Sequence, residues 1–255
     1  MYSMVKRGQA TLFIIVGIVL VALVVLYFVA VKQDIIPPLL GRGDAATELA
    51  QIDEQITECL ADLGSQYVTI MGAQGGYIAP APDTYRLYND SQVSYLCWNQ
   101  EGTATCTNRL LTIARMEEQL EDVVDDALQT CINVYDLSND VEAAEDWVLD
   151  VTIQQDSVDL MLDYPVTVQK GEDVASEDTF EESINVPLGE LYDVSQDIVN
   201  EHAVVGDFDQ LLYMLQKISR YTIYKFKPYP DVIYQVRLRE GTYVFQFAIQ
   251  GEENV

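Results

Sequence analysis

Histidine and positive charge are scarce in this sequence. Its 255 residues contain one histidine, His202, and 14 lysines and arginines against 41 aspartates and glutamates, a formal net charge of −27. So acidic a chain repels nucleic-acid phosphates, which excludes nucleic acid as a partner. With one histidine and no Cys-x-x-Cys pair, the sequence also argues against a structural zinc site.

Catalytic motifs are missing as well. There is no Gly-x-Ser-x-Gly sequence, and a Ser–His–Asp triad would have to take His202 from a polar helix. No Gly-Lys-Ser/Thr follows the glycines at positions 72, 75 and 76, so they do not predict a phosphate-binding loop. We therefore expect no enzyme activity, no cofactor and no metal site.

One long uncharged run stands near the N-terminus. Residues 10–31 are mostly Val, Ile and Leu. Because a helix needs about 20 apolar residues to cross a bilayer, this run predicts a transmembrane helix, with the lipid bilayer as its partner. Lys6 and Arg7 favour a cytoplasmic N-terminus over residues 1–9. Residues 32–255 are then extracytoplasmic, which predicts a cell-membrane location.

A break separates this run from the rest of the chain. Pro37 and Pro38 cannot continue a helix, so residues 32–43 are expected to form a Pro/Gly hinge. Beyond it we expect a helical, disulfide-bearing part over 44–146 and an antiparallel, β-rich part with two helices over 147–255. The predicted fold class is α+β: a transmembrane helix, a long helix pair with disulfides, then a largely antiparallel sheet with covering helices.

The periodicity of residues 44–146 predicts two helices around one hairpin. Apolar residues recur every three or four positions after Asp44, which is a good N-cap, and stop where glycines and prolines follow position 71. Residues 91–106 predict a hairpin with a turn near Gly102. A second helix is expected from Thr107 or Asn108 to about Ile132, with the acidic run 117–126 as its solvated face.

The later part alternates with period two. Strands are expected over 147–153, 158–164 and 180–186, and then helices over 188–203 and 207–220. Three C-terminal strands follow, in YTIYKFK, VIYQVRLR and TYVFQFAIQ. A two-residue turn at Glu240-Gly241 would pair Val236 with Phe245 and Tyr234 with Phe247.

Four cysteines form an even set: Cys59, Cys97, Cys106 and Cys131. An extracytoplasmic compartment permits disulfides, and four cysteines allow three pairings. We favour Cys59–Cys131, because both lie on apolar helix faces, and Cys97–Cys106, because they flank the predicted hairpin.

Two surface features are candidate sites. Asn89-Asp90-Ser91 is a sequon, which makes Asn89 a glycosylation candidate. Six cations gather in 23 residues of an otherwise acidic chain, and the four on neighbouring strands could share one face that meets an anionic surface or a second copy. They are Lys217, Arg220, Lys225, Lys227, Arg237 and Arg239.

The segment KRGQATLF resembles the class III signal of archaeal type IV pilin-like proteins, in which a cationic pair and glycine precede glutamine and an apolar helix. The resemblance implies cleavage between Gly8 and Gln9 by a prepilin-type peptidase. The outline of the whole chain, from KRGQATLFIIVGIVLV through GAQGGYI to YVFQFAIQ, is also similar to uncharacterised single-span surface proteins of small-genome archaea. That second resemblance implies no activity.

Three hypotheses of function follow, given in order of preference. The first is a single-pass, membrane-anchored extracytoplasmic protein with a binding or structural role at the archaeal cell surface. The second is a pilin-like filament subunit processed after Gly8. Phe13, where pilin-like proteins commonly carry Glu, and the Pro37-Pro38 break favour the anchor. An extracytoplasmic enzyme of unknown class is the third.

Overall fold

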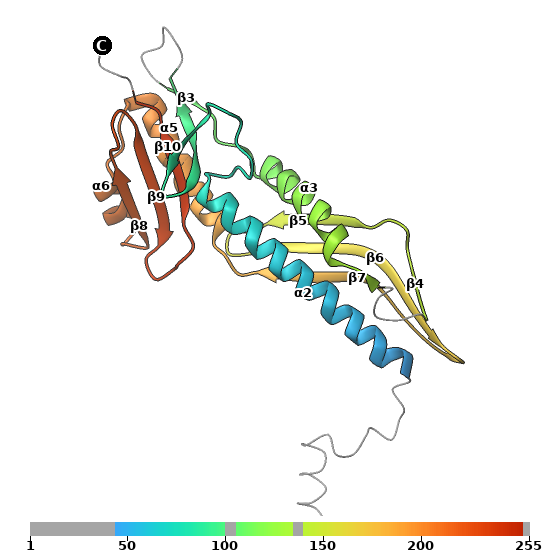
Figure 1. Cartoon of the computed structure of the whole chain (residues 1–255). Coiled ribbons are helices and arrows are strands. Elements are labelled where there is room, and N and C mark those ends of the chain that lie inside the picture. Colours follow the sequence, from blue (N-terminus) through green and yellow to red (C-terminus); the bar gives the residue numbers. More distant parts are fainter. Residues whose placement is uncertain (1–43, 100–105, 135–139, 252–255) are drawn as a thin grey trace, which may run out of the picture.

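The computed structural model describes residues 44–99, 106–134 and 140–251 (Figure 1). This part of the chain is α+β, with four helices: α2 (Asp44–Ala73), α3 (Ile113–Cys131), α5 (Leu188–Val205) and α6 (Gln210–Gln216). Its strands are β1 (Tyr85–Tyr88), β2 (Ser91–Trp98), β3 (Thr107–Asn108), β4 (Val141–Ala143), β5 (Val148–Ile153), β6 (Val158–Lys170), β7 (Asp173–Ile184), β8 (Tyr221–Phe226), β9 (Val232–Leu238) and β10 (Phe245–Ile249).

Helix α2 is the longest of the described helices and runs along the four-stranded sheet (Figure 1). Its buried side includes Ile56 and Cys59, as the apolar spacing predicts. The helix ends just before Gly75 and Gly76, which have positive φ angles of 72° and 89°. The Gly76 N–H donates to the Met71 carbonyl at 2.9 Å. The predicted glycine stop is thus confirmed, because these positions need the left-handed backbone that glycine adopts without strain.

A four-stranded antiparallel sheet lies along α2. Strand β6 pairs with β7 on one edge and with β4 and β5 on the other. Burial alternates along β5 and β6, as predicted, and the buried face is covered by α2 and α3 (Figure 1). The β6–β7 hairpin is longer than predicted. The first residues of β7 were missed because this exposed, acidic strand has almost no alternation of burial.

The second sheet has six strands in the order β1-β2-β10-β9-β8, with β3 also paired to β2. The predicted register of β9 and β10 is confirmed: Val236 pairs with Phe245, and Tyr234 with Phe247. Strand β2 pairs with β10 in parallel. The predicted parts 44–146 and 147–255 therefore share this sheet. Helix α5 packs against β2, β9 and β10 and covers the inner face.

The two disulfides have the predicted pairing. Cys59–Cys131 joins α2 to the last residue of α3, with Cα atoms 6.0 Å apart. Cys97–Cys106 joins β2 to the residue before β3, with Cα atoms 5.3 Å apart. The first bond therefore fixes the helix pair that lies on the four-stranded sheet, and the second lies within the six-stranded sheet.

The acidic run 117–126 is not simply a solvated face. The Ile153 N–H donates to Glu117 at 2.8 Å, and the Val151 N–H donates to Glu121 at 3.1 Å. The indole N–H of Trp147 donates to an oxygen of Asp125 at 2.7 Å. Glu117 and Glu121 thus accept from backbone donors of edge strand β5 that have no partner strand, and Asp125 binds the side chain just before this strand.

Several predicted boundaries are wrong. Residues 107–108 pair with β2 as β3, and α3 begins only at Ile113, with Thr112 as its N-cap. The helix expected over 207–220 is the shorter α6, since Ile218 and Ser219 have positive φ angles of 54° and 55°. These left-handed residues are incompatible with a continuing α-helix.

The predicted fold class is corrected in its membrane element. Within the described ranges 44–99, 106–134 and 140–251, no helix is long and apolar enough to cross a membrane. The longest, α2, carries acidic residues along its length and is amphipathic. The described fold is therefore an α+β domain of four helices, two sheets and two disulfides. The predicted segments 1–9, 10–31 and 32–43 lie outside it.

Candidate binding cleft and the predicted basic residues

A polar cleft of about 440 Å³ lies between α5, α6 and the turn that joins β5 to β6. We call it the α5–α6 cleft. Its lining residues are Gln155, Asp156, Glu190, Asp193, Val194, Asp197, Tyr213, Lys217, Arg220 and Tyr221.

The start of α5 positions one wall of the cleft. Gly189 lies so close to the β5–β6 turn that a Cβ atom there would clash with the Gln154 carbonyl oxygen. The N–H groups of Gly189 and Glu190 donate to the carbonyls of Gln154 and Gln155 at 3.2 and 3.1 Å. These contacts hold Gln155 against the helix. Asp193 follows Glu190 by one helical turn, so both carboxylates face the cleft.

Hydrogen bonds fix the three α5 carboxylates that line the cleft. Arg220 binds Glu190 with two nitrogens, Nη2 to Oε2 at 2.7 Å and Nε to Oε1, and the Tyr221 hydroxyl donates to the same Oε1 at 2.7 Å. The Tyr213 hydroxyl donates to Asp197 at 2.8 Å, and the Gln155 amide donates to Asp193 at 3.1 Å. The cleft is thus preorganised by its own donors.

These contacts shift the pKa values of Glu190 and Tyr221, among others. The hydrogen bond from Arg220 lowers the pKa of Glu190 below its ordinary range, despite partial burial. Burial, together with the hydrogen bond to Glu190, raises the pKa of Tyr221 to about 12. Near neutral pH, Glu190 is therefore an ionised acceptor and Tyr221 a neutral donor.

The charge of the cleft does not suit an anion. Four carboxylates and two cations line it, a formal charge of −2, and Arg220 is already paired with Glu190. A neutral polar ligand or a cationic one fits this charge better.

The six basic residues do not gather at one place, and the four strand cations predicted to share a face do not share it. Lys217 and Arg220 line the α5–α6 cleft, whereas Arg239 lines a separate groove between α6 and β8. Lys225 lies opposite Tyr234 in the β8–β9 ladder and Arg237 lies opposite Thr222. Because side chains alternate along a strand, Lys225 and Arg237 point to opposite faces of the sheet. Lys227 is exposed beyond the end of β8.

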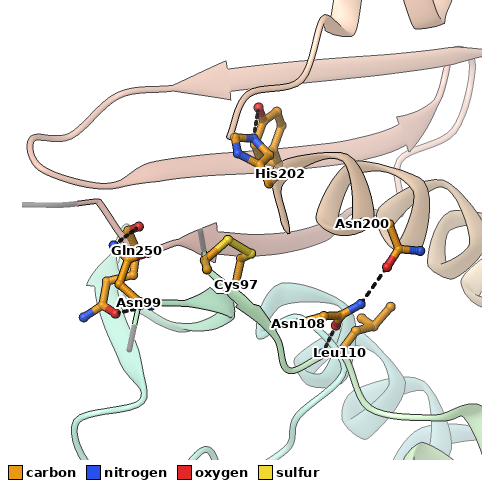
Figure 2. The surroundings of a disulfide bond; sticks show 9 residues. Cys97, Asn99, Asn108, Leu110, Asn200, His202 and Gln250 are labelled. Carbon is orange, nitrogen blue, oxygen red and sulfur yellow. Dashed lines mark hydrogen bonds between the residues drawn. A yellow bond between two sulfur atoms is a disulfide. The ribbon is translucent and has the colours of Figure 1, made fainter. Parts of the chain in front are cut away.

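A buried polar cluster lies under the inner face of the sheet. A hydrogen bond of 2.8 Å joins His202 Nε2 to the Tyr234 hydroxyl (Figure 2). Lys225 binds Asp207 and the Phe208 carbonyl, and its Nζ lies 5.6 Å from the Tyr234 ring centroid. Burial, and then the charge of Lys225, lower the pKa of His202 to about 4. The single histidine is therefore a neutral structural residue.

Acid should destabilise the folded state through His202. The folded pKa is depressed, so the imidazole stays neutral above about pH 4, whereas in the unfolded chain it binds a proton below about pH 6.5. Its contribution is complete above pH 6.5 and declines as the pH falls. Between pH 7.5 and pH 5 we expect wild type to lose about 2 kcal/mol of unfolding free energy relative to His202→Gln. Urea denaturation of both proteins measures this difference, and parallel pH profiles would contradict it.

Outside the predicted sites, Asn99 donates two hydrogen bonds to Gln250 beside the Cys97 disulfide, from its backbone N–H to Oε1 at 2.9 Å and from Nδ2 to the carbonyl oxygen at 3.0 Å (Figure 2). The remaining predicted sites are placed as follows. Asn89 is exposed at the turn between β1 and β2. Gly8 and Gln9 lie outside the described residues. No cluster of His, Cys, Asp and Glu among the described residues could hold a metal ion.

The tyrosines and α5 carboxylates of the cleft were missed by sequence reasoning. The spacing of Glu190, Asp193 and Asp197 at three and four residues was the available signal. Of the residues that line the cleft, only Lys217 and Arg220 were predicted as site residues, because cations are rare in the chain.

Comparisons with protein-family models, with curated proteins and with solved structures gave no match to this chain.

Proposed function

We propose that this chain is an extracytoplasmic protein, anchored in the cell membrane through residues 10–31, with a binding or structural role at the archaeal cell surface and no catalytic one. The observation that carries the proposal is that all four cysteines are paired in disulfides. Disulfides persist in oxidising compartments outside the cytosol and, in mesophiles, are rare within it.

The arrangement of the described elements supports attachment at one end. The first residues of α2 lie beside the tip of the β6–β7 hairpin, where Lys170 forms an ion pair with Glu48 (Figure 1). The six-stranded sheet lies at the opposite end of α2. Anchoring through residues 10–31 therefore leaves the six-stranded sheet free to face away from the membrane.

The chemistry of the α5–α6 cleft supports binding rather than catalysis. Glu190 is held ionised by Arg220, so it is a poor proton donor near neutral pH. Asp193 and Asp197 each accept a hydrogen bond from the protein itself. Fixed acceptors and donors of this kind suit recognition of a polar or cationic group.

Protease treatment of intact cells tests the location. We expect an added protease to degrade residues 44–251 without permeabilisation, while a cytoplasmic marker protein stays intact. A chain that is cut only after the cells are permeabilised would contradict an extracytoplasmic position.

The peptide left in the membrane decides between the anchor and a pilin-like filament subunit. The second function is favoured by the sequence Lys6-Arg7-Gly8-Gln9. A retained peptide whose mass matches a sequence that begins at Gln9 would support processing and assembly into a filament. A retained peptide that still includes Lys6 and Arg7 supports the permanent anchor.

A further inference from the structure

The turn between β1 and β2 presents the one Asn-x-Ser/Thr sequence of the chain, Asn89-Asp90-Ser91. Tyr88 pairs with Ser91, so Asn89 and Asp90 form a two-residue turn, with φ angles of 47° and 62°. Both φ angles are positive, as in a type I′ hairpin turn, and asparagine tolerates this conformation better than most residues. Asn89 and Asp90 are both exposed. The acceptor amide is therefore at the tip of a hairpin.

The β1–β2 hairpin lies over the outer face of the six-stranded sheet, which is the face turned away from α5. Tyr88 packs against a small apolar cluster of Val93, Ile233 and Ala248 on that face. Its ring centroid is 6.0 Å from that of Phe226 on β8. The turn is thereby held beside the outer side of β8.

Exposed aromatic side chains continue from this point along β8. The Phe226 and Tyr224 rings are 6.2 Å apart, with 24° between their planes, and 36% and 43% of these residues is exposed. The Arg237 guanidinium lies 5.5 Å from the Tyr224 ring centroid, and its Nη2 donates to the Tyr224 hydroxyl at 3.1 Å. We call Tyr88, Phe226, Tyr224 and Arg237 the aromatic strip.

We propose that Asn89 carries an N-linked glycan and that the first sugars of this glycan pack on the aromatic strip. The inference rests on the proposed extracytoplasmic location, because N-glycans are attached to translocated segments. The C–H face of a sugar ring is apolar and packs on an aromatic face, while its hydroxyls accept hydrogen bonds from a guanidinium such as Arg237. The glycan covers aromatic surface that no described element of the chain covers.

The attachment is a glycosyl transfer from an oligosaccharide carried on a lipid phosphate or diphosphate. Asn89 Nδ2 forms a bond to the anomeric carbon, and the bond from that carbon to the phosphate oxygen breaks. The electron pair leaves with the phosphate, and one amide proton passes to solvent. The co-reactant is thus the activated sugar lipid, and no oxidant or reductant is needed.

Peptide mass tests the modification on protein isolated from its own membranes. Trypsin cleavage at Arg86 and Arg109 gives the peptide 87–109, which contains Asn89. After reduction we expect its mass to exceed the sequence mass by whole sugar residues, and the excess to vanish in Asn89→Gln.

Thermal unfolding tests the packing. We expect Phe226→Ser to lower the melting temperature of the glycosylated protein by roughly 3 °C more than it lowers that of Asn89→Gln. The matched control is Met161→Ser, a 42% exposed apolar residue on the other sheet, whose effect should be the same in both backgrounds. If the protein is glycosylated but Phe226→Ser lowers the melting temperature equally in both backgrounds, the proposed packing is wrong.

The protease experiment separates the two levels of failure. An unmodified peptide 87–109 from a chain that is degraded on intact cells overturns the glycan and leaves the proposed function standing. An unmodified peptide from a chain protected on intact cells overturns both.

Discussion

Replacing both Cys59 and Cys131 by alanine is expected to lower the free energy of unfolding by about 4 kcal/mol under oxidising conditions, because the bond closes a long loop in the unfolded chain. The two cysteines are 72 residues apart in sequence. In the folded state the bond also fixes α2 against α3. Urea denaturation of wild type and variant measures the loss.

The second disulfide provides the matched control. Cys97 and Cys106 are only nine residues apart, so the same model assigns their removal about 3 kcal/mol. Reducing the wild type should cost at least as much as the Cys59/Cys131 pair alone. Equal stability of reduced and oxidised wild type would contradict the prediction.

Asp231→Ala should destabilise the fold by about 4 kcal/mol, because it leaves partly buried donors without an acceptor. Only 4% of Asp231 is exposed. Its carboxylate binds Arg86, accepts from the Tyr95 hydroxyl at 2.8 Å and accepts from the Gly251 N–H at 3.0 Å. One side chain therefore ties β1, β2 and the chain after β10 to the start of β9.

Two variants isolate the cause. Glu118→Ala removes an ion pair with Arg115 that is exposed on both sides, and should change stability by about 0.5 kcal/mol or less. Adding Arg86→Met to Asp231→Ala should recover part of the loss, because the unpaired guanidinium is removed as well. A loss in Asp231→Ala no larger than that in Glu118→Ala would contradict the role given to this carboxylate.

Much of the local structure could be predicted, because its signals are short in range. The alternation in residues 232–249 and the Glu240-Gly241 turn gave the correct β9–β10 register. The apolar spacing around Cys59 and Cys131 placed these cysteines on facing helices and so gave their pairing. In each case, the residues that determine the geometry are close in sequence or share an apolar face.

Long-range pairing could not be predicted. Strand β2 lies beside β10 although Tyr95 and Ala248 are far apart in sequence, and no local pattern encodes a parallel contact of this kind. The five-residue connection over 227–231 sets the register of β8 on β9, and a connection of that length has no fixed turn type. For that reason the sequence could not tell that Lys225 and Arg237 face opposite ways. The α5–α6 cleft depends on the same long-range placement.

The position of Cys59 within α2 also has a mechanical consequence. A pulling force on residues 1–43 would enter the described fold at Asp44, fifteen residues before Cys59. Unravelling that length of helix would extend the chain by about 30 Å. The load would then pass through the Cys59–Cys131 bond into α3, leaving the rest of α2 in place. The first four turns of α2 would thus unfold under force and take up extension, and the disulfide would limit how far the unfolding proceeds along the helix.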